Sequence, residues 1–238
     1  MAKKKAPIYE SMLIVSDPHF PYQHKDIVPF LKHLKKKYKP DLVVFTGDEV
    51  DYHAISFHDS DPDLMSAGYE LEAAIEELQP IYKLFPEAKI MESNHGSLVL
   101  RKALANGLPQ KVLRPYNEIL EAPDGWEWMF DLTVQTPLGP VYFHHSKGAN
   151  VLKNSQAMGM SFVQGHHHES FCIQYWGNPN ALMFGMTVGC LVDPDSLALA
   201  YNKNNLKRPV IGTGLIIKGI PILEPMILGE DGRWIGPV

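Results

Sequence analysis

The sequence predicts an α/β fold, and three observations support this prediction. Short apolar runs at residues 12–16, 42–46 and 88–92 are typical of buried strands, and segments with helical periodicity lie between them. After Gly125 the chain contains mainly strand-type runs. A chain of 238 residues, 45% of them hydrophobic, is also long enough to bury one sizeable core.

The first half of the chain alternates strand and helix. Apolar residues recur at helical spacing over residues 27–38, with lysines on the opposite face, and Pro40 ends this helix. A second helix is predicted over residues 67–84, and we expect Pro80 to kink or interrupt it near its end. Because helical crossovers join successive strands, the sheet should be mostly parallel. Ligand sites in such sheets lie beyond the carboxyl ends of the strands.

The second half is predicted to be rich in strands. Residues 96–120 still have a helical pattern, with a break at the sequence NGLP. The strand-type runs that follow are WEWMFDLTVQ, PVYFHHS, SFVQG, SFCIQYW, ALMFGMTV and GTGLIIKG. Trp126 and Trp128 alternate within the first run, and at least one of them should lie in the core. Since we find no internal repeat and no low-complexity linker, we expect a single domain over residues 1–238, without a separate capping domain.

Composition and charge exclude several classes of protein. The net charge of −5 argues against bulk binding of nucleic acid, and the basic stretches at residues 32–39 and 202–208 are typical of solvated surfaces. The two cysteines, Cys172 and Cys190, form neither a zinc-binding spacing nor a disulfide framework. The sequence contains no signal peptide and no apolar run that is long enough to span a membrane. We therefore expect a cytoplasmic protein that is not a membrane protein; its oligomeric state is not assigned.

Polar side chains of one chemical kind follow the predicted strands. The strand ends carry the sequences SDPH, GDEVD, SNH, HHS and GHHHE, so each of them delivers carboxylate, amide or imidazole groups. Each sequence alone is common turn chemistry, but together they gather metal-binding side chains at one edge of the fold. Because side chains alternate along a strand, His166 and His168 are expected to face the site while His167 faces away.

The types of ligand indicate a site for two metal ions. Mixed carboxylate, imidazole and carboxamide donors suit divalent ions such as Mn, Zn or Fe, and Ni or Mg are alternatives. The set is too large for one ion. It suits two ions that share a bridging carboxylate, roughly 3.5–4 Å apart, as in two-metal hydrolysis of phosphoesters.

These motifs resemble those of the calcineurin-like metallophosphoesterases. The family pattern is D-x-H, G-D-x-x-D, G-N-H-[DE], a lone H and G-H-x-H. The chain has DPH at 17–19, GDEVD at 47–51, SNHG at 93–96, HH at 144–145 and GHHH at 165–168, in the same order. The resemblance implies a four-layer α/β sandwich, in which two mixed β-sheets are flanked by helices.

The resemblance also implies a role for each matching residue. The ligands of the first ion would be Asp17, His19, Asp48 and His168. The ligands of the second ion would be Asp48, Asn94, His166 and one histidine of the pair His144 and His145. We favour His145, because the family histidine is followed by a small residue and Ser146 fits that position. His95 would act on the leaving group and Asp51 would orient His95. No residue is assigned to substrate binding, although His24, His53 and His58 lie near the first two motifs.

The third motif departs from the family pattern at both ends. Ser93 stands where the family has glycine, and Gly96 stands where it has Asp or Glu. The acidic residue is not a metal ligand in the family, so we expect the metal site to persist. The hydrogen bonding of this loop should differ, which affects the placement of His95.

The motifs favour a dinuclear metal-dependent phosphoester hydrolase, with Mn as the preferred ion. The G-H-x-H ending resembles the family's phosphodiesterases and nucleases, so we favour a phosphodiesterase, with a nuclease acting on DNA or nucleotides as a special case. One alternative is a phosphomonoesterase acting on a small molecule or nucleotide. The other is a non-catalytic scaffold of the same fold.

Overall fold

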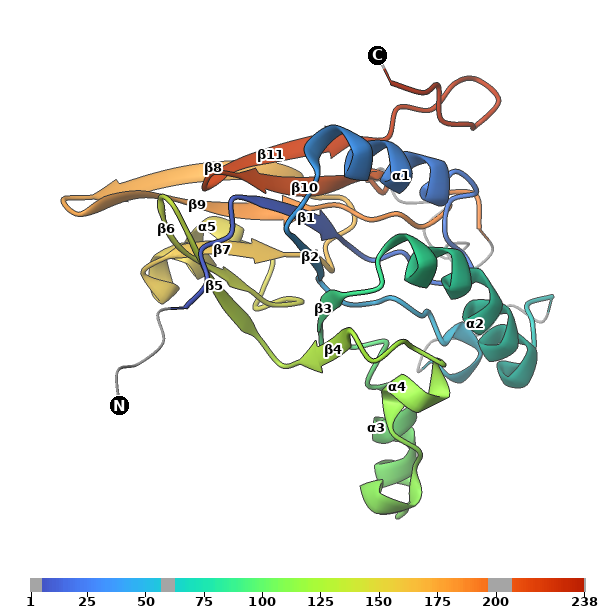
Figure 1. Cartoon of the computed structure of the whole chain (residues 1–238). Helices are drawn as coiled ribbons and strands as arrows, with labels where there is room; N and C mark the ends of the chain where they lie inside the picture. Colours follow the sequence, from blue (N-terminus) through green and yellow to red (C-terminus); the bar gives the residue numbers. More distant parts are fainter. Residues whose placement is uncertain (1–5, 57–62, 197–206, 238) are drawn as a thin grey trace.

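Two β-sheets pack face to face, and helices cover the outer face of each sheet (Figure 1). The structure is a computed structural model that describes residues 6–56, 63–196 and 207–237. The predicted α/β fold, with two mixed sheets flanked by helices, is confirmed. The single-domain organisation stays a prediction.

The larger sheet has six strands in the order β11-β10-β1-β2-β3-β4. Their bounds are β1 Ser11–Val15, β2 Leu42–Phe45, β3 Ala88–Met91, β4 Trp126–Met129, β10 Gly212–Ile217 and β11 Ile220–Pro225. Strands β1 to β4 run parallel to one another, as expected, whereas β10 pairs antiparallel with β1 and β11. The parallel strands therefore present their carboxyl ends at a common edge.

The smaller sheet has five strands in the order β5-β6-β7-β9-β8. Their bounds are β5 Leu132–Thr136, β6 Gly139–Phe143, β7 Ser161–Gln164, β8 Phe171–Asn178 and β9 Ala181–Val188. Strands β6, β7 and β9 run parallel, and the two edge strands β5 and β8 are antiparallel to their neighbours. The carboxyl ends of β6 and β7 therefore also lie at one edge of their sheet.

The helices divide between the outer faces of the sheets and the loop region after β3. They are α1 Ile27–Tyr38, α2 Ala67–Leu84, α3 Leu98–Ala105, α4 Tyr116–Ile119 and α5 Val151–Met158, with the short 3₁₀ turns η1 His53–Ile55 and η2 Gln110–Val112. Figure 1 shows α3 and α4 extending away from the sheets below β4. Among the described residues, no helix is both long enough and apolar enough to cross a bilayer.

Strand β1 shows how the two layers of core arise from one sequence. Its side chains alternate: Leu13 and Val15 pack in the cluster beneath α1 and α2, whereas Met12 and Ile14 pack between the sheets. All four side chains are fully buried. A strand that is apolar on both faces is typical of a parallel sheet covered on both sides, which fits the continuous run MLIV.

Helix α2 continues through Pro80 to Leu84, so the helix is not interrupted there, and a kink stays a prediction. A proline inside a helix costs about 3 kcal/mol, because it removes one backbone hydrogen bond and crowds the preceding turn. Leu78 and Ile81 flank the proline and are fully buried against the larger sheet. Burial of two such side chains contributes about 3–6 kcal/mol, which offsets that cost.

The predicted run WEWMFDLTVQ forms two strands in different sheets. Residues 126–129 are β4, at the edge of the larger sheet, and residues 132–136 are β5, at the edge of the smaller one. The chain crosses between the sheets at Asp131, whose carboxylate accepts a hydrogen bond from the Tyr142 hydroxyl at 2.9 Å. Trp126 is 3% exposed, which confirms the expectation that at least one of the two tryptophans lies in the core.

Asp26 attaches the C-terminal segment to the start of α1. Its carboxylate accepts hydrogen bonds from the Arg233 guanidinium, with Nε at 2.8 Å, and from the backbone N–H of Trp234 at 2.9 Å. The hydrogen bonds from Arg233 and Trp234 lower the pKa of Asp26 to about 2. The Trp234 ring then packs edge-on against Phe30 of α1.

We predict that Asp26→Asn destabilises the fold at neutral pH but not at low pH. A carboxyl group whose pKa is lower in the folded state stabilises that state above its ordinary pKa of 3.8, and the contribution disappears as pH falls towards 2. The variant should lower Tm by about 2–4 °C at pH 7, and the difference from wild type should shrink at pH 3. Scanning calorimetry measures both values. Glu230→Gln, at an exposed position, is the matched control. If Asp26→Asn lowered Tm by the same amount at pH 7 and at pH 3, the result would contradict this account.

Candidate metal centre

Loops from both sheets converge on one cluster of side chains. The loops after β1, β2 and β3 of the larger sheet meet the loops after β6 and β7 of the smaller one. The structure brings together every residue that the sequence analysis assigned to the site: Asp17, His19, Asp48, Asp51, Asn94, His95, His145, His166 and His168.

One group of ligand atoms joins the two sheets through Asp17, His19 and His168. One potential ligand atom from each residue lies within 4.8 Å of the others. His19 Nε2 is 3.1 Å from His168 Nε2, and His168 Nε2 is 3.5 Å from Asp17 Oδ1. The Asp17 carboxylate also accepts the backbone N–H of His166 at 3.0 Å, which fixes the smaller sheet's loop against the larger sheet.

A second group contains Asp48, His145 and His166. His145 Nε2 lies 3.3 Å from Asp48 Oδ2, 3.2 Å from His166 Nδ1 and 2.6 Å from Asn94 Oδ1. The other ring nitrogen of His145 contacts the backbone carbonyl of Thr46 at 2.8 Å, which fixes the orientation of the imidazole. His145 therefore contacts the other three side chains that were expected around the second ion.

Asp48 lies between the two groups. Its Oδ2 is 3.3 Å from His145 Nε2 on one side and 3.8 Å from His19 Nε2 on the other. A third group, His19, Asp48 and His95, connects the other two. The Asp48 side chain is the only carboxylate among the described residues that belongs to both the His19 side and the His145 side of the cluster.

The spacing and chemistry of these side chains fit two divalent ions. Two ligand atoms that share an ion, each about 2.1 Å from it and about 90–110° apart, are separated by roughly 3.0–3.4 Å. The nitrogen pairs His19–His168 and His145–His166 lie 3.1 and 3.2 Å apart, within this range. Nitrogen and oxygen donors without thiolate suit Mn, Zn or Fe.

Electrostatics keep the central carboxylates ionised. Burial by itself raises the pKa of Asp48, but the neighbouring His145 and His95 hold this pKa well below its ordinary value. Burial likewise lowers the pKa of His145, but Asp48 and Asp17 outweigh it and raise that pKa to about 9. Buried charges are tolerated here because each carboxylate lies beside an imidazole. Ionised carboxylates are also the form that metals bind.

His95 and Asp51 form the expected pair. His95 Nδ1 lies 3.0 Å from Asp51 Oδ1, while the His95 side chain is 24% exposed and the Asp51 side chain 6% exposed. Burial opposes protonation, yet Asp48 and Asp51 raise the pKa of His95 to about 10. The Asp51 carboxylate also lies 3.1 Å from His19 Nδ1, so it orients a candidate ligand as well as His95.

His145 and His144 point to different sides of β6. His144 lies outside the three groups of potential ligands among the described residues. Its ring stacks on Tyr142 and meets Phe130 edge-on, and burial lowers its pKa to about 4. The structure thus places His145, not His144, beside Asp48.

The histidine run lies beyond β7, so the expected reason for its orientation is wrong. Strand β7 ends at Gln164, and residues 165–168 form a turn instead of continuing the alternation of a strand. His166 adopts a left-handed backbone with φ of 66°, which turns its side chain towards His145. The His167 ring instead contacts the Ser146 hydroxyl at 3.2 Å. The orientations match the expectation, but a turn produces them.

Unusual backbone conformations are concentrated at this site. The left-handed region is occupied by Asp17, His19, Asp48, Tyr52 and His166, with φ values of 47°, 53°, 50°, 54° and 66°. Elsewhere in the described chain, Lys39, Glu121 and Lys218 are the non-glycine residues in this region. Each such residue costs about 1–2 kcal/mol, and clustered strain is typical of functional sites.

Gly165 allows the loop after β7 to approach the first motif. A Cβ at this position would lie 2.3 Å from both Asp17 Oδ2 and Ser16 Oγ, and 2.6 Å from Thr46 Oγ1. Any larger residue would therefore push the two sheets apart at the site. The glycine of the GHHH motif is required by this close contact.

Ser93 shows how the third motif differs from the family pattern. Its hydroxyl accepts hydrogen bonds from the backbone N–H of Asp48 at 2.9 Å and from that of Gly96 at 3.1 Å. The backbone N–H of His95 donates to Asp48 Oδ1 at 3.1 Å. The loop after β3 is thus tied to Asp48 from two directions, and His95 remains in the site.

Sequence reasoning missed Glu70, which supports the second motif. Glu70 lies in α2, is 1% exposed, and accepts the backbone N–H groups of His53 at 2.6 Å and Ala54 at 2.9 Å. Its position among other acids of an amphipathic helix gave no signal. His24 and His53 are buried, and His24 contacts the Gly232 carbonyl at 3.0 Å; His58 lies outside the described residues.

The family of the chain follows from a comparison with protein-family models. The model for calcineurin-like phosphoesterases matches residues 11–188, a span that contains every motif described above. The chain belongs to the calcineurin-like phosphoesterase family. At the level of the family, membership supports hydrolysis of phosphoesters with divalent metal ions, for which the three groups of side chains supply candidate ligands.

Several solved structures are similar to this calcineurin-like phosphoesterase. Vps29 of Chaetomium thermophilum is 12% identical, with a TM-score of 0.47 over 95% of this chain and 93% of that one. An archaeal phosphodiesterase is 13% identical, with a TM-score of 0.46 over 90% and 99% of the chains. Yfce, a phosphoesterase from E. coli, is 13% identical, with a TM-score of 0.44 over 96% and 98%. A comparison with curated protein sequences finds no match.

We predict that the histidines facing the cluster bind metal and that their neighbours do not. His145→Ala and His166→Ala each remove one candidate ligand, so affinity for Mn²⁺ should fall by at least about 10-fold. His144→Ala and His167→Ala are the matched controls and should change the affinity by less than about 3-fold. Titration calorimetry on the metal-free protein measures these values. Loss of affinity in His167→Ala with retention in His166→Ala would contradict the assignment.

Proposed function

We propose that this protein is a dinuclear metal-dependent phosphodiesterase. The observation that carries this proposal is the position of Asp48 between two groups of metal-type ligands. A site that holds two ions about 3.5–4 Å apart is suited to in-line attack on phosphorus. Family membership supports the reaction class, and the specificity for a diester is our inference.

The two ligand sets follow the geometry of the cluster. Asp17, His19 and His168 would hold the first ion, and Asn94, His145 and His166 the second, with Asp48 shared between them. When bound, the ions would polarise the phosphoryl oxygens and lower the pKa of a water molecule. We propose Mn²⁺ as the ion, since the donors are oxygen and nitrogen.

We assign to His95 the role of stabilising or protonating the leaving group. Its Nδ1 is held by Asp51, which leaves Nε2 as the nitrogen available to the substrate. A protonated imidazole at this position stabilises negative charge and can donate a proton to a departing oxygen. Asp51 holds the ring in one orientation and stabilises its charge.

A diester is favoured by the ending of the last motif. The GHHH sequence matches the G-H-x-H pattern, and this ending is similar to that of the family's phosphodiesterases and nucleases. A nuclease acting on DNA or nucleotides is the special case that we consider first, although the net charge of −5 disfavours tight binding of long nucleic acids. We also propose a cytoplasmic location, which the free thiols of Cys172 and Cys190 support.

We predict that the wild-type protein loaded with Mn²⁺ hydrolyses the diester bis-p-nitrophenyl phosphate faster than the monoester p-nitrophenyl phosphate.

We also predict that His95→Ala reduces kcat by about 10²–10⁴, because the variant lacks the group that protonates the leaving oxygen. The reduction should be largest for an alkoxide leaving group, which needs protonation, and smaller for p-nitrophenolate. The variant should keep two ions per chain and its Tm. Steady-state kinetics and elemental analysis measure these quantities.

The control for His95→Ala is His33→Ala, which changes a histidine of α1 beside Trp234, away from the cluster. Faster hydrolysis of the monoester would favour a phosphomonoesterase. A wild-type protein that binds two ions but hydrolyses no phosphoester with Mn, Mg, Zn or Ni would favour a scaffold. If His95→Ala loses a metal ion, His95 is a metal ligand and does not act on the leaving group. Its position beside His19 and Asp48, in the third group of side chains, is compatible with that result.

A further inference from the structure

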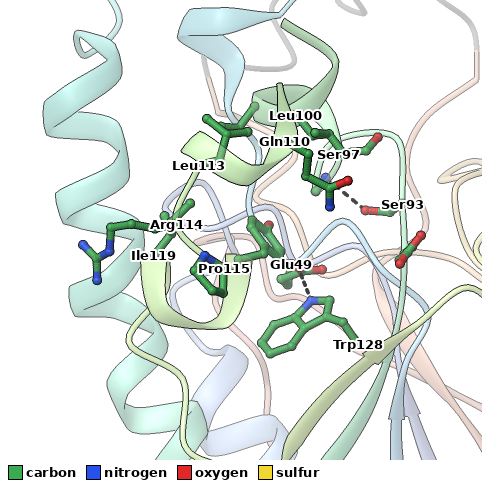
Figure 2. A pocket seen from close by; sticks show the side chains of 14 residues that line it. Glu49, Ser93, Ser97, Leu100, Gln110, Leu113, Arg114, Pro115, Ile119 and Trp128 are labelled. Carbon is green, nitrogen blue, oxygen red and sulfur yellow. Dashed lines mark hydrogen bonds between the residues drawn. The ribbon is translucent and has the colours of Figure 1, made fainter. Parts of the chain in front are cut away.

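A cavity of about 400 Å³ lies beside the metal cluster, outside the three groups of potential ligands. It is enclosed by α3, η2, α4, the end of β4 and the loop after β3 (Figure 2). Its volume is within the range of about 300–1,000 Å³ that is usual for small-molecule sites. Its walls are mostly apolar, with a few polar groups, which is also usual for such sites.

The loop after β3 connects this cavity to the metal cluster. Ser93 and Gly96 line the cavity, while Asn94 and His95, between them in the sequence, face the cluster. The Ser93 hydroxyl is hydrogen-bonded to the backbone N–H of Asp48 at 2.9 Å. The cavity and the cluster therefore share this loop as a common wall, so the cavity lies next to the place where a substrate phosphate would bind.

Glu49 is a buried acidic group in the wall of this cavity. It follows Asp48 in the sequence and is 1% exposed. Its Oε1 accepts a hydrogen bond from the indole N–H of Trp128 at 2.9 Å, a contact that is drawn in Figure 2. Its Oε2 has no hydrogen-bond partner of standard geometry among the described residues, and the Tyr116 hydroxyl, which interacts with the Glu49 carboxyl group, likewise has none. An unsatisfied buried oxygen is costly, so Oε2 is the atom that a ligand with an N–H donor would satisfy.

Gly96 keeps the approach to Glu49 open. A Cβ at this position would lie 3.5 Å from Glu49 Oε1, 3.4 Å from the Tyr116 hydroxyl and 3.1 Å from Ser93 Oγ. A side chain at this position would lie against the Glu49 carboxyl group, so the glycine leaves the space beside Glu49 Oε1 unfilled.

We propose that this cavity binds the nucleobase of a nucleotide phosphodiester. Trp128 and Tyr116 supply aromatic surfaces, with ring centroids 5.6 Å apart and planes at 80°. Flat bases pack on such surfaces, and every common base has an N–H donor for Glu49 Oε2. The inference rests on the proposed phosphodiesterase activity, because it names the substrate of the same site.

The test compares esters that share one leaving group. Methyl p-nitrophenyl phosphate reports the metal centre alone, thymidine 5′-p-nitrophenyl phosphate adds a base with an N–H donor, and the N3-methylthymidine ester removes that donor. With Mn²⁺, kcat/KM for the thymidine ester should exceed that for the methyl ester by at least about 10-fold and that for the N3-methyl ester by about 3- to 10-fold.

Three variants locate the preference in the cavity. Glu49→Leu should remove the discrimination between the thymidine and N3-methylthymidine esters, whereas Glu49→Gln, which keeps an acceptor for Trp128, should retain part of it. Leu100→Trp fills the cavity from α3 and should lower the ratio of thymidine to methyl ester by about 10-fold. Leu104→Trp, on the same helix but 54% exposed and outside the lining, is the matched control and should keep the wild-type ratio.

A second readout needs neither metal nor catalysis. Saturation-transfer NMR of thymidine with the metal-free protein should show contacts to the base, and these should disappear in Leu100→Trp. Hydrolysis of the methyl ester without a preference for thymidine, together with absence of these contacts, would overturn the nucleobase site and leave the phosphodiesterase standing. Base contacts without hydrolysis of any ester would overturn the phosphodiesterase and support the site.

Discussion

The buried carboxylate of Asp48 is the constraint on which the rest of the site depends. It is 1% exposed, yet it lies between imidazoles from both sheets, with His19 on one side and His145 on the other. A buried charge of this kind is tolerated only where hydrogen bonds and opposite charges surround it. From the third motif, the backbone N–H of His95 donates a hydrogen bond to the Asp48 carboxylate, and the Ser93 hydroxyl fixes the Asp48 backbone by accepting its N–H. Side chains and backbone from the loops of both sheets thus surround the Asp48 carboxylate.

The fold provides the rigid support for this arrangement. Parallel strands bring their carboxyl ends to one edge, and the packing of the two sheets brings the edges together. The left-handed conformations of Asp17, Asp48 and His166 turn their side chains inward at a cost in backbone strain. The close contact at Gly165 fixes the distance between the sheets at this point. Backbone strain and buried charge each destabilise the folded protein. Their occurrence at the same place is typical of a site that is preorganised for metal ions.

The sequence was sufficient to predict the parallel half of the fold and the members of the cluster, because apolar runs locate strands and strand ends locate sites. It was not sufficient for features that depend on contacts between distant segments. Helix α2 passes through Pro80 because its apolar face is buried against a sheet, which local propensity does not describe. The turn at residues 165–168 depends on Asp17, and the position of Glu49 in the cavity wall depends on its hydrogen bond with Trp128. In each case tertiary contacts outweigh the local pattern.

Anomalous X-ray diffraction from crystals of the protein loaded with Mn²⁺ tests the central claim most directly. The account predicts two manganese peaks per chain, roughly 3.5–4 Å apart, with the Asp48 carboxylate between them and His95 outside both coordination shells. A single peak, or a second peak that does not contact Asp48, would contradict the dinuclear site from which the proposed function follows.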